Sequence, residues 1–211
     1  MTTVNGKFEG GKLDANWAID NNSNRAYGPV LPTSGTLGAL GTVGAIRYAL
    51  HSSWNVAGLP GPIMCGEVNL NGNSNPYLGF YYAYSDKGNG TIDANYGGTA
   101  PTIKTEVSED CGVNWTTVNT ITCKETGKPT VAGNWYIPTS AEYQGVAFTL
   151  PTYANKSILV KVTGTPGSNG NALYVDEIHM LQATEVNDII ATTGNMNIYP
   201  NPAVNNTTLS F

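Results

Sequence analysis

Charged side chains are scarce in this sequence of 211 residues, and the positive ones are not clustered. Asp, Glu, Lys and Arg make up 12% of the chain, against about a quarter in an average soluble domain, and the net charge is −5. Proteins that bind nucleic acid neutralise its phosphates with grouped Lys and Arg, so the composition argues against a nucleic-acid partner. Long apolar runs are missing too. No stretch approaches the ~20 apolar residues of a membrane-spanning helix, so no membrane span is expected.

Histidine is nearly absent, which limits the catalytic chemistry available. His51 and His179 are the only two, and neither belongs to a His-Glu-x-x-His zinc motif. The sequence also has no Gly-x-Ser-x-Gly nucleophile elbow. Four carboxylates could supply a pair for glycoside cleavage, but no spacing selects two of them: Asp86, Asp93, Glu106 and Glu142. The sequence therefore predicts that this chain is not itself an enzyme.

Helical periodicity is almost absent as well. Short runs with apolar residues at every second position dominate, separated by turn residues at intervals of roughly 8–15 residues. This pattern predicts an all-β fold, a single antiparallel jelly-roll β-sandwich over residues 1–181, followed by a linker over residues 182–194. The expected strands are residues 44–50, 63–68, 77–84, 102–108, 115–122, 146–150, 158–163 and 173–181.

Three cysteines, Cys65, Cys111 and Cys123, leave three possible disulfide pairings. If residues 113–122 form one straight strand, Cys111 and Cys123 lie about 30 Å apart, far beyond the ~7 Å between bridged α-carbons. That argument favours a bridge that uses Cys65. Three unpaired thiols are the alternative.

The last residues carry a separate motif. Tyr199, Pro200, Asn201 and Pro202 precede a run of alternating polar and apolar residues. Residues 195–211 resemble the truncated start of the C-terminal sorting domain of Bacteroidetes proteins exported by the type IX system. The resemblance implies a secreted or outer cell-surface protein, with the secretion machinery as a partner. No signal peptide is visible, so a piece of a longer precursor is expected. An ordinary proline-rich turn before an edge strand is the alternative.

Four further segments resemble, in order, parts of MAM-like and choice-of-anchor β-sandwich modules of Bacteroidetes secreted proteins, to which cleaved adhesin domains are more distantly related. Residues 7–11 with Trp17 look like the first strand, residues 75–84 the central strand, residues 107–115 a Ser-x-Asp-x-Gly-x-x-Trp hairpin, and residues 171–178 the closing strand. The form of this hairpin with a cysteine in its turn resembles the non-catalytic region behind the protease domain of pappalysin-type metalloproteases. The resemblance implies a non-catalytic accessory or adhesion module, with upstream domains of a parent protein as partners.

A calcium site is expected where the first and last strands meet. Such strands lie side by side in a jelly roll, so Glu9 and Asp176 would converge, and Ca²⁺ takes six to eight oxygen ligands. Alternation places Asp176 on one strand face with Tyr174, Ile178 and Met180; if that is the core face, the buried charge needs a partner. The resemblance also implies a structural calcium at Glu9 and Asp176. Hydrogen bonding of Asp176 to turn amides is the alternative. Looser candidates for ligands are Asp20, Asp86 and Glu177.

Aromatic residues support a second function. The chain has 12 Tyr and 4 Trp, and an exposed flat ring stacks well on sugars. Trp54 and Trp135 lie in expected loops, which makes them the candidates for binding a surface glycan. Trp115 follows a turn and is expected to close one end of the sandwich. A carbohydrate-binding module is therefore the alternative to an adhesion module, and simple packing is the structural alternative for both candidate tryptophans.

Overall fold

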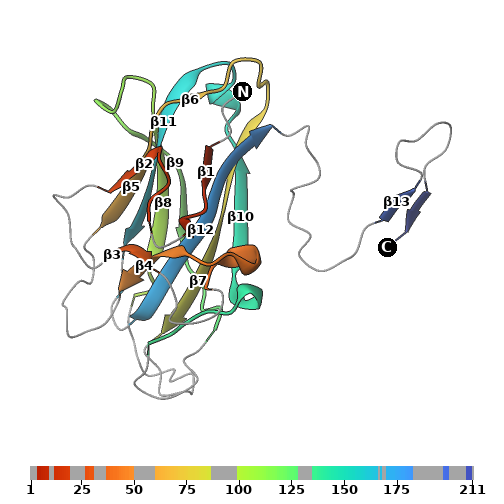
Figure 1. The fold of residues 1–211 in the computed structure, drawn as a ribbon. Helices are drawn as coiled ribbons and strands as arrows, with labels where there is room; N and C mark the ends of the chain where they lie inside the picture. The colour runs from red at the N-terminus through yellow and green to blue at the C-terminus, as the bar shows by residue number, and fades with distance from the viewer. Residues whose placement is uncertain are drawn as a thin grey trace.

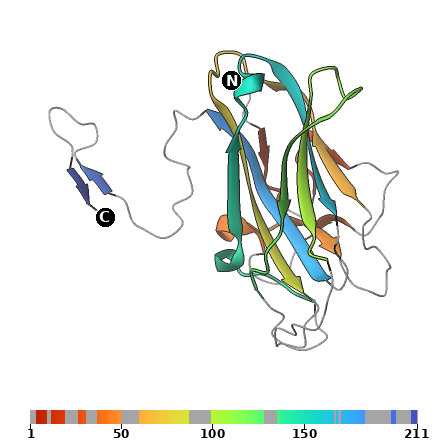
Figure 2. The ribbon, with the colours of Figure 1, turned by 180° about the vertical axis from the view of Figure 1, so that it is seen from behind.

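Two antiparallel six-stranded β-sheets lie face to face in the computed structural model (Figure 1 and Figure 2). The structure describes residues 4–9, 12–19, 27–30, 37–49, 60–86, 99–127, 135–165, 167, 170–182, 197–199 and 208–210. Sheet 1 has the order β10 (Gln144–Thr149), β7 (Pro76–Asp86), β12 (Gly170–Gln182), β4 (Ala45–Ala49) and β3 (Tyr27–Val30), with β1 (Val4–Gly6) also paired to β12. Sheet 2 has the order β2 (Trp17–Ile19), β5 (Gly61–Cys65), β11 (Ser157–Thr165), β8 (Thr102–Ser108) and β9 (Thr116–Thr122), with β6 (Val68–Asn69) paired to β11.

The predicted antiparallel all-β sandwich is confirmed. Each of the eight expected strands corresponds to an observed one, and residues 102–108 match β8 at both ends. The expected strand 63–68 is instead two short strands, β5 and β6, with a break at residues 66–67. No helix among the described residues is long and apolar enough to cross a membrane.

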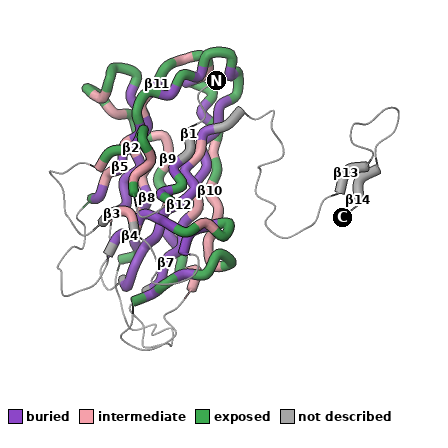
Figure 3. Tube along the Cα trace, viewed as in Figure 1, coloured by how far each residue is buried: buried purple, intermediate pink, exposed green. Residues whose placement is uncertain are grey.

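The main core lies between the sheets, where buried residues follow the strands in Figure 3. One strand that contributes strongly is β7, whose Leu78, Phe80, Tyr82 and Tyr84 all face inward. Because side chains alternate along a strand, the intervening Ala83 faces the opposite side of sheet 1. The aromatic side chains of this run therefore supply the main core, and the small side chain of Ala83 belongs to the outer face.

The first and last strands of the sandwich are neighbours, as predicted. Gly6 in β1 lies opposite Ile178 in β12. Just after β1, Phe8 enters the core and meets Trp17 edge-on, with ring centroids 5.8 Å apart. A β-carbon on Gly6 would lie 2.9 Å from the Phe8 ring, so glycine permits this close packing.

A β-bulge at Glu177 interrupts the alternation along β12. The register with β7 shifts just after Asp176, and Glu177 has a φ of 49°. As a result Tyr174 and Asp176 lie on the outer face of sheet 1, whereas Ile178 and Met180 turn into the main core. The expectation that Asp176 shares a face with Ile178 and Met180 is wrong. It assumed regular alternation along the whole strand, and the bulge at Glu177 shifts the alternation by one residue.

A second, smaller buried cluster covers part of the outer face of sheet 1. The sheet contributes Ala45, Ala83, Ala172 and Tyr174, and they are covered by residues 37–44 and 135–143, which together we call the outer cap. The cap contains two short 3₁₀ turns, η2 (Ala39–Gly41) and η4 (Ser140–Glu142). Asp176 is therefore buried even though it faces away from the main core.

Hydrogen bonds fasten the outer cap to the sheet and to itself. The Tyr136 backbone N–H donates to Asn171 Oδ1 at 2.7 Å, and the Tyr174 hydroxyl donates to the Tyr136 carbonyl at 2.6 Å. The Tyr143 hydroxyl donates to the Leu37 carbonyl at 3.1 Å, which joins the two halves of the cap. The cap is thus a fixed part of the fold.

All three cysteines are free thiols, so the expected bridge through Cys65 is wrong. Cys65 and Cys123 both lie in the main core, but β11 and β8 lie between β5, which carries Cys65, and β9, which ends just before Cys123. Three strand spacings amount to about 14 Å, which is too far for a disulfide. Cys111 is exposed in the turn between β8 and β9.

Near the C-terminus, β13 (Asn197–Tyr199) and β14 (Thr208–Ser210) pair as a separate two-stranded sheet. Tyr199 of the proline motif ends β13. The rest of that motif, Pro200, Asn201 and Pro202, lies outside the described residues, as does the expected linker apart from Gln182.

Candidate functional site

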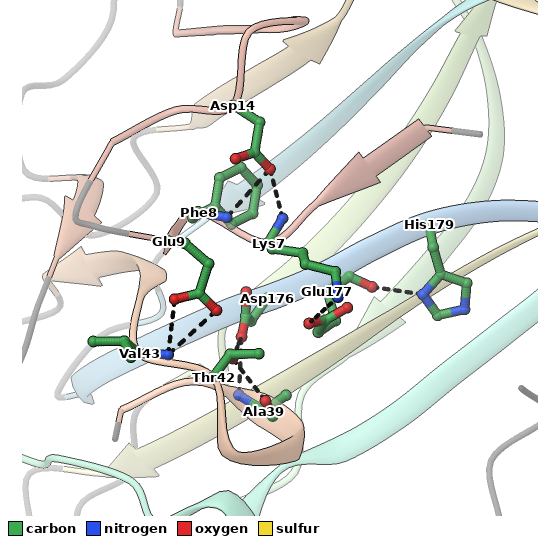
Figure 4. A network of polar contacts seen from close by, with 10 residues as sticks. All are labelled: Lys7, Phe8, Glu9, Asp14, Ala39, Thr42, Val43, Asp176, Glu177 and His179. Atoms are coloured by element: carbon green, nitrogen blue, oxygen red, sulfur yellow. Dashed lines mark hydrogen bonds and ion pairs between the residues drawn. The ribbon is translucent and has the colours of Figure 1, made fainter. Parts of the chain in front are cut away.

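The predicted ligand Asp176 is held beneath the outer cap, directly before the bulge in β12. Its side chain is 0% exposed. One carboxylate oxygen, Oδ2, accepts hydrogen bonds from the Ala39 backbone N–H at 2.9 Å and from Thr42 Oγ1 at 2.8 Å (Figure 4). This oxygen therefore performs the turn-capping role that was the alternative to metal binding.

The other oxygen, Oδ1, is buried and has no hydrogen-bond partner among the described groups. Burial raises the pKa of Asp176 to about 8, although the Thr42 hydroxyl and the nearby N–H groups of Glu177 and Ala39 oppose the shift. The charge of Glu177 raises the pKa further. A half-satisfied buried carboxylate is costly, because desolvating a charge must be compensated by a partner.

The second predicted ligand, Glu9, binds the same segment of the cap. Both of its oxygens accept from the Val43 backbone N–H, at 3.1 and 3.3 Å. The segment lies close because glycines flank it: a β-carbon on Gly38 would lie 2.5 Å from Asp176 Oδ2, and one on Gly44 would collide with the Phe8 carbonyl. Glu9 and Asp176, 167 positions apart in the sequence, thus converge on residues 39–43 (Figure 4).

Other charges surround this pair. Glu177 is buried, and its carboxylate lies 3.7 Å from Lys7 Nζ. Burial raises the pKa of Glu177, Lys7 acts in the opposite sense, and the charges of Glu9 and Asp14 raise it again. Asp14 Oδ2 accepts the Lys7 backbone N–H at 2.7 Å. Four carboxyl groups are therefore gathered here, and Lys7 is the cation that acts on Glu177, so Glu9, Asp14 and Glu177 together carry more negative charge than Lys7 offsets.

Asp176 and Glu9 are the groups of this arrangement that could hold a hard cation, and both already accept hydrogen bonds from the cap. Within the described residues no group of three His, Cys, Asp or Glu side chains can hold a metal by itself, so a calcium ion here would also need carbonyl oxygens or water. Two features favour the cation: the buried Oδ1 without a partner, and the excess of negative charge. The looser candidate Glu177 belongs to this site. Asp86 does not, since it pairs with Gly170 at the far end of β12, and Asp20 lies outside the described residues.

The predicted sugar-binding residue Trp135 lies at the start of the second cap segment. Along residues 135–138 exposure alternates, so Tyr136 and Pro138 point into the protein while Trp135 and Ile137 point out. Trp135 is 37% exposed, and the Arg47 guanidinium carbon lies 4.9 Å from its ring centroid. A cation over one face holds the ring in place. The other candidate, Trp54, lies outside the described residues.

Trp115 is part of an ion network on the outer face of sheet 2. Lys161 Nζ lies 4.2 Å from the centre of its ring, and the same ammonium is 3.0 Å from Glu106. Glu106 also pairs with Lys104 at 3.0 Å. Trp115 was expected to close one end of the sandwich. In the structure, one face of its ring is instead covered by the Lys161 ammonium.

The remaining candidates for chemistry have structural contacts. Glu142 caps η4, where its carboxylate accepts the Thr139 backbone N–H at 2.7 Å. Nδ1 of His179 lies 2.7 Å from the Glu177 carbonyl. Glu106 is held by the two lysines of the ion network, so it is not paired with a second carboxylate. His51 and Asp93 lie outside the described residues.

Comparison with known proteins gives the fold a context. No protein-family model and no curated protein sequence matches this chain. The K1 cleaved adhesin domain of Lys-gingipain from Porphyromonas gingivalis W83 matches with a TM-score of 0.58 at 15% identity, over 86% of this chain and 99% of that one. The module TmCBM61, solved with β-1,4-galactotriose, matches with a TM-score of 0.51 at 15% identity, over 84% of this chain and 94% of that one. The likeness is one of fold.

A third solved structure extends the same pattern. CBM27-1 of Caldicellulosiruptor saccharolyticus, in complex with mannohexaose, has a TM-score of 0.50 at 13% identity, over 85% of this chain and 96% of that one. Adhesin domains and carbohydrate-binding modules therefore share this sandwich fold. In each of the three matches, nearly the whole length of the solved domain aligns with this chain.

Sequence reasoning found the two carboxylates of the site but missed what holds them. Thr42 and the N–H groups of Ala39 and Val43 come from an irregular segment with no periodic signal. The one sequence signal of a loop there is the glycine-rich composition of residues 35–41. Asp14 was also missed. Its carboxylate accepts the backbone N–H groups of Lys7 and Phe8, a local contact that no motif in the sequence announces.

Proposed function

We propose that this chain is a non-catalytic binding module of the adhesin type, belonging to a larger secreted or cell-surface bacterial protein. The observation that carries the proposal is the sandwich itself, which matches an adhesin domain and two carbohydrate-binding modules over at least 94% of their length and at least 84% of this chain. The contacts of Glu106, Glu142 and His179 support it, because each side chain is engaged in holding the fold.

The test is binding without turnover. The purified module is applied to a glycan array and to immobilised extracellular proteins, and retention on at least one surface is expected. Release of reducing sugar or of new peptide ends from a bound surface would show an enzyme and would contradict the proposal.

A structural calcium ion is the second part of the proposal. Asp176 and Glu9 would hold it, with carbonyl oxygens of the cap nearby as further ligands, and its charge would compensate the four carboxylates. The carrying observation is the buried, unpartnered Oδ1 of Asp176. Bound calcium would tie the cap to β12 and to the segment after β1, so its role would be to stabilise the fold.

Calorimetric titration and thermal unfolding test the calcium site. Metal-depleted protein is expected to bind Ca²⁺, and EDTA to lower the melting temperature by several degrees. Asp176→Asn keeps an oxygen that can accept from Thr42 but removes the charge, so it should abolish both effects. Glu109→Gln, at an exposed carboxylate paired with Lys156, is the matched control and should leave them intact. Absence of binding heat in metal-depleted protein would end the proposal.

Carbohydrate binding is the alternative function, favoured by the exposed ring of Trp135 on its Arg47 support. A pyranose would stack on the exposed part of the ring, as sugars do on exposed aromatic residues. If a glycan ligand is found, Trp135→Ala should abolish binding, while Ile137→Ala, the exposed neighbour on the same segment, should not. Trp54→Ala tests the other candidate. Unchanged affinity in both tryptophan variants would exclude this site.

We also propose that residues 195–211 begin a type IX sorting domain, and that a pappalysin-type protease is one candidate parent. The pairing of β13 with β14 is consistent with a small β-domain starting here. The parent protein carrying Pro200→Ala and Pro202→Ala is expected to stay inside the cell envelope. Normal export of that variant would contradict the sorting role.

A further inference from the structure

Among the described residues, besides the very short strands β1 and β6, the two sheets end in four edge strands, and three of these are protected against pairing with another chain. Exposed edges present unpaired backbone groups, which proteins guard by shortness, proline, charge or a bulge. β2 has only three residues, β3 has four and includes Pro29, and β9 is bulged where its register with β8 shifts beside Glu106. Each of these edges is a poor template for a further strand.

The fourth edge strand, β10, has none of these guards. It is six residues long, its register with β7 is regular from Gln144 to Thr149, and it contains no charged residue and no proline. Within the described part of the chain, no strand other than β7 pairs with it. β10 therefore offers a straight, neutral and open edge along one flank of the sandwich, clearly seen in Figure 2.

The side chains of β10 are only partly covered by the protein's own core. Val146 and Phe148 face inward and pack against the main core, yet both remain half-exposed because the sheet stops beside them. Ala147 and Thr149 lie on the opposite face and are exposed. An additional strand on this edge would extend the core over Val146 and Phe148.

We propose that β10 is a self-association edge, at which two copies of this chain pair antiparallel about a two-fold axis through Ala147. In an antiparallel pair, residues directly opposite each other have side chains on the same face of the sheet. A two-fold axis keeps each residue on its own face, so it must pass beside one residue that meets its own copy, and it cannot pass between two consecutive residues. With the axis at Ala147, Val146 of each copy meets Phe148 of the other, a favourable pair of β-branched and aromatic side chains. Small residues, Gly145 and Ala147, line the other face and leave room for the approach.

The sequence of β10 matches itself across this axis, and its lack of charge allows a second copy to occupy the edge. The chain as a whole carries −5, so two copies repel each other over most orientations, but the β10 edge brings no like charges into opposition. Stable interfaces bury ~1,200–2,000 Å² of surface, and a six-residue strand pair buries less than that. The dimer is therefore weak and forms at high local concentration. On a crowded surface, pairing would double the number of binding sites presented together and increase avidity.

Sedimentation equilibrium over a wide concentration range tests the dimer. The average mass of the wild-type chain is expected to rise from one chain towards two as concentration increases. Ala147→Lys places two like charges on the axis and should keep the protein monomeric at every concentration, with its melting temperature unchanged because Ala147 is exposed. Ala18→Lys, at an exposed position on the short edge strand β2, is the matched control and should dimerise like wild type.

Disulfide cross-linking tests the register. In a Cys111→Ser background, Ala147→Cys places two cysteines opposite each other on the axis, within reach of a disulfide, and mild oxidation should give a covalent dimer. Thr120→Cys, exposed on β9, should not cross-link to a comparable extent. A monomer at millimolar concentration, or a dimer that survives Ala147→Lys, would overturn the proposal. Failure of Ala147→Cys to cross-link within a demonstrated dimer would overturn the axis.

Discussion

The imidazole of His179 occupies the space where a β-carbon on Gly79 would lie. The two residues are partners across the β7–β12 ladder, and a β-carbon built on Gly79 would be 2.6 Å from Nε2 of the histidine. The other ring nitrogen is 2.7 Å from the Glu177 carbonyl, so the ring joins the bulge to the neighbouring strand. Glycine at this position is what allows the ring to approach the backbone of β7 so closely.

Replacing Gly79 should therefore disturb the bulge. Gly79→Ala is expected to destabilise the protein by about 1–3 kcal/mol, the usual cost of overpacking, because the ring must leave its contact with the Glu177 carbonyl. Urea unfolding measures the change. In a His179→Ala background the same substitution should cost much less. An equal cost in both backgrounds would show that the histidine is not the obstacle.

Without bound cation, the stability of the protein should fall as pH rises. The folded pKa of Asp176, about 8, lies above its ordinary value of 3.8, so the folded state holds a proton that the unfolded state has released between those values. The contribution of this group is thus complete below about pH 4 and lost by about pH 8. Melting temperatures in EDTA across this range measure the effect.

Saturating calcium should flatten that pH profile at neutral and higher pH, since the ion compensates the ionised carboxylate. Asp176→Asn has no proton to release at this position and should give a smaller decline than wild type, with or without calcium, the remainder coming from Glu177, whose pKa burial also raises. A wild-type profile in EDTA that does not decline would show that Asp176 is already ionised at low pH.

The ion network on sheet 2 should stabilise the fold measurably. Burial acts to raise the pKa of Glu106, but hydrogen bonds and charges of Lys104 and Lys161 outweigh it and lower the pKa below its ordinary value of 4.5. Glu106→Gln leaves Lys161 largely covered and without its counter-charge, so a loss of about 1–3 kcal/mol is expected in thermal or urea unfolding.

Acid should produce the same loss in the wild-type protein. A lowered folded pKa means that the contribution of Glu106 is present above about pH 4.5 and disappears as pH falls through the folded value. The exposed pair of Glu109 with Lys156 is the comparison, and Glu109→Gln should change stability by less than about 1 kcal/mol. Equal effects of the two substitutions would show that the network adds nothing to a surface ion pair.

The three thiols should differ sharply in reactivity. Burial raises the pKa of Cys65 to about 11 and that of Cys123 to about 12, whereas Cys111 is exposed in the β8–β9 turn. Because the thiolate is the reactive form, a thiol reagent should label one cysteine in the native protein and three after unfolding. Mass spectrometry of the labelled peptides identifies them, and rapid native labelling of Cys65 would contradict the structure.

The long strands were predictable because local pattern suffices for them. β8 and β12 have enough alternating or continuous apolar residues to stand out from the turns beside them. β2 and β3, with three and four residues, are too short to show a period, and their existence depends on pairing with β5 and β4. Such strands form because a neighbour is present, which a single segment of sequence does not reveal.

The site was predictable in part, for a related reason. Glu9 and Asp176 were found because the neighbouring positions of first and last strands follow from topology. The face of Asp176 was wrongly assigned because one left-handed residue, Glu177, reverses the alternation, and a glutamate gives no sign of that conformation. The partners Ala39 and Thr42 lie more than 130 positions away from Asp176 in an irregular segment, so only the folded chain shows them.

The pairing of β1 with β12 determines how the sandwich responds to tension. Val4 lies opposite Met180 and Gly6 opposite Ile178, so the segments that precede β1 and follow β12 leave the sandwich at the same end. A pull between those segments loads the ladder at the Val4 end, and its three pairs break in succession instead of together. Under load, β1 peels away first, and the remaining strands of sheet 1 stay joined.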